Sequence, residues 1–165
     1  PYLTSRLGVR FVEGLQGEGP VMKAAACAKH FAVHSGPEAI RHEFDAKATK
    51  KDMWETYLPA FKALVQKADV REVMCAYQRL DDDPCCGNTR LLQQILRDEW
   101  GFDGIVTTDW WTFGEHYRET KAGNDIKMAA GYPERIKEAY EKGFITEAEI
   151  RLSARRILNM ILKID

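Results

Sequence analysis

The sequence lacks any segment that could anchor it in a membrane and any excess of charge of one sign. No apolar run approaches the roughly 20 residues that a bilayer-spanning helix needs. With 24 basic and 25 acidic residues, the formal net charge is −1, so we expect neither a nucleic acid nor a membrane as a partner. At 165 residues, 45% of them hydrophobic, the chain matches one globular domain that can bury a sizeable core.

Motifs that mark common cofactor and metal sites are also missing. None of the four cysteines lies in a C-x-x-C pair, so we expect all four to be structural residues without a disulfide framework. Gly17 and Gly19 follow a helical pattern and lack a third glycine, which argues against a phosphate-binding loop. His30 and His34 lie four residues apart but have no convincing third ligand. We therefore expect no cofactor and no metal.

Helical periodicity is clear at both ends of the chain. Leu3, Leu7 and Phe11 recur at every fourth position and predict a helix over 1–15 whose apolar face packs on a core. Because the chain opens inside this pattern and without Met, we expect it to be a piece of a longer protein, and its N-terminus does not reveal a compartment. Further helices are predicted over 49–67 with a kink at Pro59, from the cap Asn88, over 133–143, and over 146–163.

Strand patterns alternate with these helices. Largely apolar runs at 24–28, 72–77 and 105–108 predict buried parallel strands, and residues 123–128 predict a short fourth strand. This alternation predicts an α/β fold, either a piece of a (β/α)8 barrel or a doubly wound sheet. The missing glycine fingerprint favours the barrel. Since four strand–helix units make about half of a barrel of roughly 250 residues, residues 1–165 are predicted to be a single fragment, a partial, half TIM-like barrel with parallel strands.

Polar side chains capable of chemistry stand where three predicted strands end. They are Lys29 and His30, Tyr77 with Arg79, and Asp109 with Trp110. In a barrel these exits meet on one face. Cationic and hydroxyl donors, a carboxylate acceptor or nucleophile, and an indole surface together suit a sugar, whose hydroxyls need directional partners while its C–H faces stack on aromatic rings. Each residue also has a structural interpretation: Asp109 could cap the next helix or pair with an arginine.

Six segments in order resemble the family 3 glycoside hydrolases, most closely the bacterial β-glucosidases and β-xylosidases. They are Ala28–Phe31, Ser35–Glu38 with Arg41, Tyr57–Phe61, Val73–Tyr77, Leu96–Gly104 followed by Thr107–Trp110, and Ala122–Met128. Their order and spacing match over nearly the whole chain.

This resemblance implies roles for individual residues. Asp109 matches the family's catalytic nucleophile, and Lys29 and His30 match the pair that holds sugar hydroxyls. Tyr77 matches a residue beside the nucleophile, and Trp110 one that contacts sugar at the edge of the subsite. The resemblance also places Arg41 and His42 in a loop that shapes the pocket. His42 further matches an acid/base histidine of a branch acting on N-acetylglucosaminides, but Ile40 stands where that branch has aspartate.

The resemblance implies a retaining glycosidase acting on a β-linked oligosaccharide or glycoside, with partners outside this chain. The remainder of the barrel would supply further substrate-binding residues, and a second domain would supply the acid/base carboxyl. The chain alone is therefore expected to be inactive. The alternative is a carbohydrate-binding or structural barrel fragment without catalysis.

Overall fold

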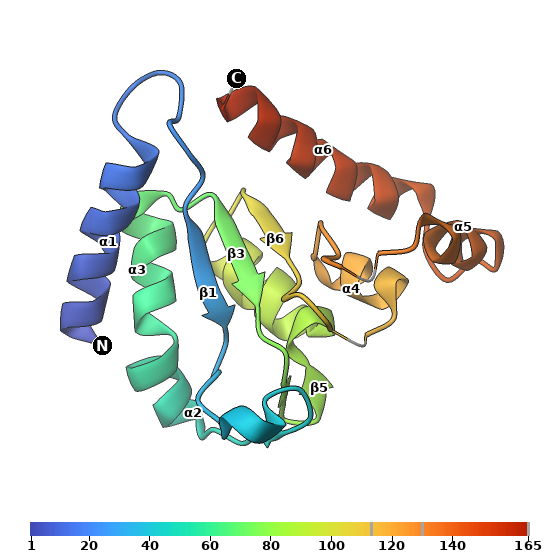
Figure 1. Ribbon diagram of the computed structural model, residues 1–165, viewed down its shortest axis with the longest axis horizontal. Coiled ribbons are helices and arrows are strands. Elements are labelled where there is room, and N and C mark those ends of the chain that lie inside the picture. Colours follow the sequence, from blue (N-terminus) through green and yellow to red (C-terminus); the bar gives the residue numbers. More distant parts are fainter. Residues whose placement is uncertain (113, 130, 165) are drawn as a thin grey trace.

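A three-stranded parallel sheet forms the centre of the computed structural model, which describes residues 1–112, 114–129 and 131–164. Its strands are β1 (Cys27–Phe31), β3 (Glu72–Cys75) and β6 (Ile105–Thr107), in the order β1-β3-β6 (Figure 1). The predicted fourth strand is reduced to one parallel bridge between Thr107 and Ile126. The α/β class and the parallel pairing are confirmed, whereas the described strands do not close into a barrel.

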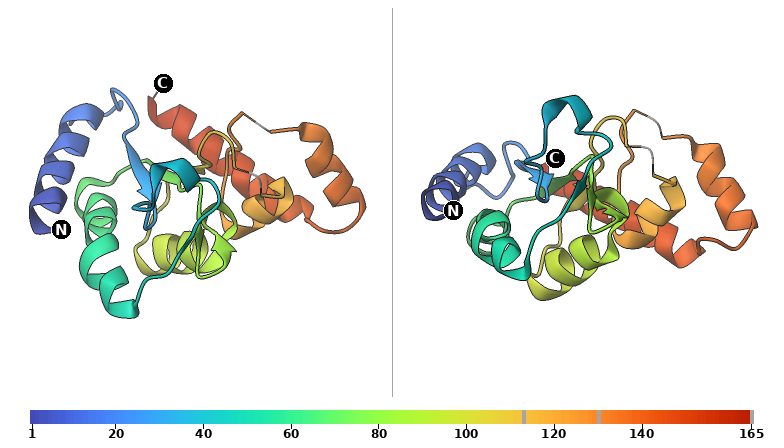
Figure 2. Two further views of the ribbon diagram at one scale, coloured as in Figure 1. Left: turned by 60° about the horizontal axis from the view of Figure 1, so that its bottom comes forward. Right: turned by 90° about the horizontal axis from the view of Figure 1, so that it is seen from below.

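Helices and a second small sheet surround these strands. The helices are α1 (Tyr2–Gln16), η1 (Glu38–Ile40), α2 (Lys50–Asp52), η2 (Met53–Tyr57), α3 (Pro59–Ala68), η3 (Cys85–Gly87), η4 (Arg90–Glu99), α4 (His116–Ala122), α5 (Pro133–Glu141) and α6 (Glu147–Ile164). The small sheet contains β2 (Asp45–Ala46), β4 (Arg79–Leu80) and β5 (Asp83–Pro84). Helix α3 packs on β1, with α1 outside it, and α6 contacts β6 (Figure 2). No described helix is long and apolar enough to cross a membrane.

Side-chain caps begin three of the predicted helices, and the predicted cap at Asn88 is confirmed. The Thr49 side chain accepts a hydrogen bond from the amide of Asp52, and Asn88 Oδ1 accepts one from the amide of Leu91. Thr146 and Glu149 form a reciprocal capping box at the start of α6. Each cap satisfies a backbone N–H that the first turn of a helix leaves without an intrahelical partner.

The first strand starts later than the sequence indicates. Pairing begins at Cys27, opposite Glu72, and continues to Phe31, opposite Cys75. Lys29 and His30 therefore lie inside β1, and not beyond its end as predicted. The strand continues past these polar residues because its pairing with β3 shifts register between Ala28 and Phe31. Ala28 and Phe31 are buried, while Lys29 is exposed.

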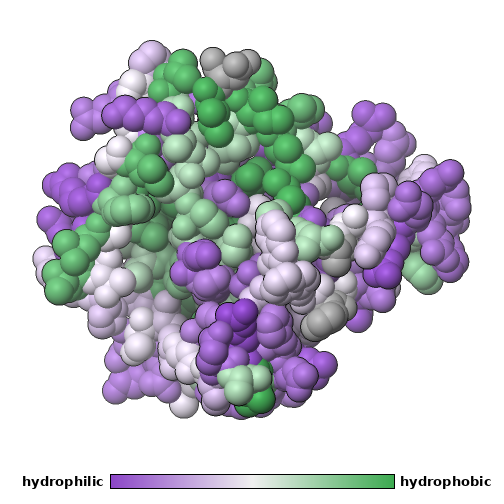
Figure 3. Space-filling view, in the orientation of Figure 1, coloured by the Kyte–Doolittle hydropathy of each residue, from purple (hydrophilic) through white to green (hydrophobic). Residues whose placement is uncertain are grey.

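The apolar stripe of α1 faces outward, contrary to the prediction that it packs on a core. Leu3, Leu7 and Phe11 are 67%, 62% and 71% exposed. The helix instead packs on α3 through Gly8 and the buried Val12; a Cβ at position 8 would lie 3.0 Å from Leu64. Helix α6 likewise exposes Leu158, Ile161 and Leu162, and apolar side chains gather over both helices (Figure 3). Two apolar helix surfaces are thus left without cover by the described residues.

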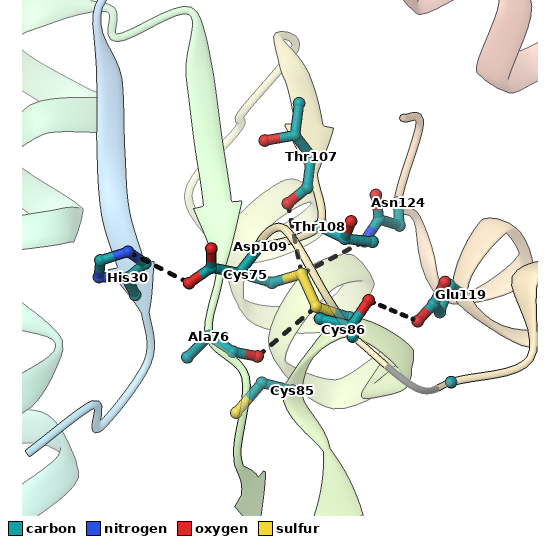
Figure 4. Close-up of a disulfide and its surroundings, with 12 residues drawn as sticks. His30, Cys75, Ala76, Cys85, Cys86, Thr107, Thr108, Asp109, Glu119 and Asn124 are labelled. Atoms are coloured by element: carbon teal, nitrogen blue, oxygen red, sulfur yellow. Dashed lines mark hydrogen bonds and ion pairs between the residues drawn. A yellow bond between two sulfur atoms is a disulfide. The ribbon is translucent and has the colours of Figure 1, made fainter. Parts of the chain in front are cut away.

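Two of the cysteines form a disulfide, so the prediction of none was wrong. Cys75, at the end of β3, is bonded to Cys86 in η3, with a Cα–Cα distance of 5.3 Å (Figure 4). The chain reverses between β4 and β5 and returns to β3, which the spacing of the cysteines could not show. Cys27 is free and exposed, and Cys85 is free and buried.

Replacing Cys75 and Cys86 together with alanine is expected to lower the free energy of unfolding by about 3 kcal/mol, because the bond closes a loop of 11 residues in the unfolded chain. Urea unfolding of the variant and of the parent, with and without reductant, measures the difference. Cys27→Ala serves as the control, since it changes an unpaired, exposed cysteine. A parent whose unfolding transition is insensitive to reductant would contradict the prediction.

Candidate active site

Strand β6 delivers Asp109 to the carboxyl edge of the sheet. Ile105 and Val106 are buried β-branched residues, and the buried Thr108 directly follows the strand. The amide of Thr108 donates to the carbonyl oxygen of Ile126, and Thr108 Oγ1 accepts a hydrogen bond from the amide of Met128. The segment beside β6 therefore fixes the backbone directly before Asp109.

Asp109 is buried, with 11% of its side chain exposed, and its two carboxylate oxygens differ in their contacts. Oδ1 accepts a hydrogen bond of 2.7 Å from the amide of Trp110. Oδ2 lies 3.3 Å from His30 Nε2 but has no hydrogen-bond partner within the described residues (Figure 4). A buried carboxylate oxygen without a hydrogen bond is costly in a purely structural role. It is what a nucleophile or a substrate-binding group requires.

Burial favours the neutral form of the His30 ring beside Asp109. Burial lowers the pKa of His30 below its ordinary value of 6.5, and the nearby Asp109 carboxylate only partly opposes this shift. The unprotonated ring can donate one hydrogen bond and accept another. It can therefore orient a substrate hydroxyl beside Asp109 without forming a full ion pair that would neutralise the carboxylate.

Tyr77 lies next to Asp109, two residues beyond the end of β3. Burial raises the pKa of its hydroxyl, and the Asp109 carboxylate raises it further. The ring of His42 lies 4.0 Å from the Tyr77 ring, and the Arg41 guanidinium lies 5.4 Å from it. Arg41 and His42, predicted to shape a pocket, are thus placed against a side chain that contacts the candidate nucleophile.

The side chains of the other predicted residues form no hydrogen bond or ion pair with the Asp109 carboxylate among the described residues. Trp110 follows it directly, is half exposed and packs edge-to-face on Trp111. Lys29 is an exposed neighbour of His30, and no ion pair of the described residues includes it. Arg79, considered with Tyr77 from the sequence, is exposed in β4 and outside this cluster.

The sequence interpretation missed two members of this cluster. Gln78 is fully buried; its Nε2 donates to the carbonyl oxygen of Ala32, and its Oε1 lies 3.0 Å from His34 Nδ1. The His34 ring in turn lies 4.8 Å from the His30 ring. Gln78 thus supports the ring that packs on His30. Its only sequence signal was a polar residue directly after Tyr77. Within the described parts of the chain, no group of three or more His, Cys, Asp or Glu side chains could hold a metal ion.

A carboxylate, a neutral imidazole and a phenol at the carboxyl edge of a parallel sheet form the kind of site that enzymes of the α/β class use. Comparison of the sequence with known protein families identifies a particular family. The model of the glycosyl hydrolase family 3 N-terminal domain matches residues 1–160. The chain therefore belongs to this family, as its six motifs indicated.

Similar proteins with known activities are several times longer than this chain. A xylan 1,4-beta-xylosidase of Xylanibacter ruminicola is 49% identical over 96% of the chain, which spans 20% of that enzyme. Beta-glucosidase A of Butyrivibrio fibrisolvens is 39% identical over 86% of the chain and 16% of its own length. The chain thus spans about a fifth of the length of the curated relatives that it matches.

The fold agrees with solved structures of the same family. Beta-glucosidase 3B from Thermotoga neapolitana, in complex with glycerol, has a TM-score of 0.91 and 31% identity; the match covers 99% of this chain and 24% of that one. The beta-glucosidase from Bifidobacterium adolescentis gives 0.90 and 30% over the same shares. These matches support the whole arrangement of elements around the candidate site.

Proposed function

We propose that this chain is the nucleophile-bearing half of a catalytic (β/α)8 barrel in a retaining β-glycosidase. The observation that carries the proposal is the buried Oδ2 of Asp109, which lacks a hydrogen bond and faces His30 beside Tyr77. The relatives named as a xylosidase and a beta-glucosidase support β-xylosides or β-glucosides as substrates. Residues 1–165 form one fragment of the barrel in this proposal.

The reaction proceeds in two steps. An Asp109 oxygen attacks the anomeric carbon as the glycosidic C–O bond breaks, and an acid protonates the departing oxygen. Water then attacks the anomeric carbon of the glycosyl-enzyme, loses a proton to the same group acting as base, and releases the Asp109 carboxylate. That acid/base group must lie roughly 5–5.5 Å from the nucleophile. In this proposal a second domain, outside these residues, supplies that group.

The remaining site residues bind the sugar. Lys29 and His30 hold hydroxyls of the ring that is attacked, and Trp110 offers an exposed indole face at the edge of the subsite. Tyr77 lies beside the nucleophile, and the stacked Arg41 and His42 shape the wall behind it. The exposed apolar side chains of α1 and α6 would be covered by the rest of the barrel.

Covalent trapping distinguishes this proposal from a carbohydrate-binding role without catalysis. That alternative is favoured by the lack of an acid/base group among the hydrogen-bond and ion-pair contacts of Asp109. A 2-deoxy-2-fluoro aryl β-glycoside is incubated with the longer protein that contains this sequence. We expect a mass increase of one fluoroglycosyl group on the peptide that contains Asp109, because fluorine slows hydrolysis of the intermediate. Binding of the glycoside without covalent labelling would instead support a lectin-like protein. Labelling at another carboxylate would overturn the assignment of Asp109.

A further inference from the structure

A buried ion pair lies immediately behind the segment that carries Asp109. Lys127 Nζ lies 2.8 Å from Glu119 Oε2, and both side chains are almost completely buried. Burial raises the pKa of the Glu119 carboxyl, while Lys127 opposes that shift. Neither residue contacts Asp109. A buried ion pair often adds little net stability, because the cost of desolvating both charges offsets their attraction. The other groups that Lys127 binds therefore indicate what the pair does.

Lys127 Nζ donates to the chain that follows Asp109. Its hydrogen bonds reach the carbonyl oxygen of Thr112 at 3.0 Å, Thr112 Oγ1 at 3.2 Å and the carbonyl oxygen of Gly114 at 3.0 Å. Thr112 Oγ1 also donates to Glu119 Oε1. A Cβ at position 114 would collide with the Glu119 carboxylate, so this glycine allows the turn to approach the ion pair. The lysine thus holds two backbone carbonyls just downstream of the site.

The backbone on either side of Lys127 holds the chain that precedes Asp109. Ile126 bridges to Thr107 and accepts a hydrogen bond from the amide of Thr108. The amide of Met128 donates to Thr108 Oγ1. The backbone around residue 127 therefore fixes the entry to the segment 109–111, while the Lys127 side chain fixes its exit.

We propose that Lys127 is a positioning residue for Asp109, with Glu119 as the anchor of its ammonium group. The proposal rests on the assignment of Asp109 as the nucleophile. The Lys127 side chain sets the geometry of attack by holding the exit of the segment from Asp109 to Trp111, while the backbone of its neighbours Ile126 and Met128 holds the entry. The ammonium group of a lysine, carried on a long stem, supplies three donors at this buried point. An error of about 1 Å in the placement of a reacting group can cost on the order of 100-fold in rate.

Lys127→Met in the longer protein that contains this sequence tests the proposal. The rate constant for trapping by the 2-fluoro glycoside reports the attack itself, and the final labelled fraction counts folded sites. We expect that rate constant to fall about 10- to 100-fold per labelled site. Hydrogen exchange at amides of 109–114 should increase, while exchange at 72–75 stays unchanged. Unaltered trapping and exchange in the labelled fraction would overturn the proposal and leave Lys127 with a structural role only.

Two further variants keep the test decisive if Lys127→Met folds poorly. Lys127→Met with Glu119→Gln removes the stranded buried charge, but it still leaves the Thr112 and Gly114 carbonyls without their donor, so the loss of trapping rate should persist. Glu119→Gln alone keeps those bonds and should lose less than about threefold, since only the anchor is weakened. A double variant that traps at the rate of the parent would also overturn the proposal.

Arg156→Met is the matched control. It removes an ion pair to the buried Asp125, which lies near the start of β6 and away from residues 109–114. Its trapping rate per labelled site should match that of the parent. If the parent itself is not labelled at Asp109, the proposed function fails, whereas the exchange of 109–114 still reports whether Lys127 holds this segment.

Discussion

Replacing Asp109 with alanine is expected to abolish hydrolysis of aryl β-glucosides and β-xylosides by the longer protein that contains this sequence. Without the carboxylate, no glycosyl-enzyme can form, and removal of a covalent nucleophile typically costs about 10⁴-fold or more in kcat. Asp109→Asn should have the same effect, because an amide oxygen is a poor nucleophile even where the shape of the side chain is kept. Release of 4-nitrophenol from the two aryl glycosides measures the loss.

Asp103→Asn is the control for this substitution. Asp103 precedes the same strand, and its carboxylate forms exposed ion pairs with Arg71 and Lys163 at the opposite edge of the sheet. Pairs of this kind contribute little to stability, so activity should stay within about twofold of the parent. Full activity in Asp109→Ala would contradict the assignment of the nucleophile.

Azide gives a second, positive readout in the Asp109→Ala variant. The truncated side chain leaves space on the face of the sugar from which the carboxylate attacks. An azide ion entering there can displace an activated aryl group and form a glycosyl azide of inverted configuration. Its formation would show that the remainder of the site still binds and orients the glycoside. A rescued product of retained configuration would instead place the nucleophile elsewhere.

Local patterns in the sequence were sufficient to predict the strands that carry the site. The buried runs that end in Cys75 and Thr107 are short, β-branched or apolar, and bounded by turn residues, so their conformation is determined by neighbours in the chain. Because parallel strands bring their carboxyl ends to one edge, the proximity of Tyr77 and Asp109 followed from the strand assignments alone. The caps at Thr49 and Asn88 were predictable for the same local reason.

Features that depend on the tertiary path of the chain were not predictable. The Cys75–Cys86 disulfide requires the reversal through β4 and β5, which no spacing rule describes. The apolar stripe of α1 has the correct period for a packed helix, yet periodicity cannot say whether the covering surface belongs to the same chain. Lys127 gave no signal at all, because a single lysine is ordinarily solvated. Its burial is visible only once α4 and the chain after Asp109 are folded around it.

The isolated chain of residues 1–165 is expected to show no turnover of aryl β-glycosides, even at high protein concentration. Under the proposed function two deficits combine: the acid/base group comes from a second domain, and part of the sugar-binding surface comes from the remainder of the barrel. Exposed apolar side chains on α1 and α6 add a third difficulty. Each large side chain left in water forgoes on the order of 1–2 kcal/mol of burial, so the isolated chain should also be less stable than it is within a barrel. Hydrolysis assays beside the longer protein measure the first expectation.

The choice of leaving group on the glycoside distinguishes the lack of an acid/base group from the lack of a complete sugar-binding pocket. A 2-fluoro glycoside with a 2,4-dinitrophenolate leaving group needs no acid to depart, so the absence of an acid/base cannot prevent labelling of Asp109. If the half pocket is the decisive deficit, the isolated chain stays unlabelled by this reagent while the longer protein reacts. Labelling of the chain alone would show that Lys29, His30, Tyr77 and Trp110 suffice to bind the sugar and that only the acid is missing. Turnover of an unactivated β-glycoside by the chain alone, lost on Asp109→Ala, would place a complete catalytic centre within these 165 residues and contradict the proposed dependence on a second domain.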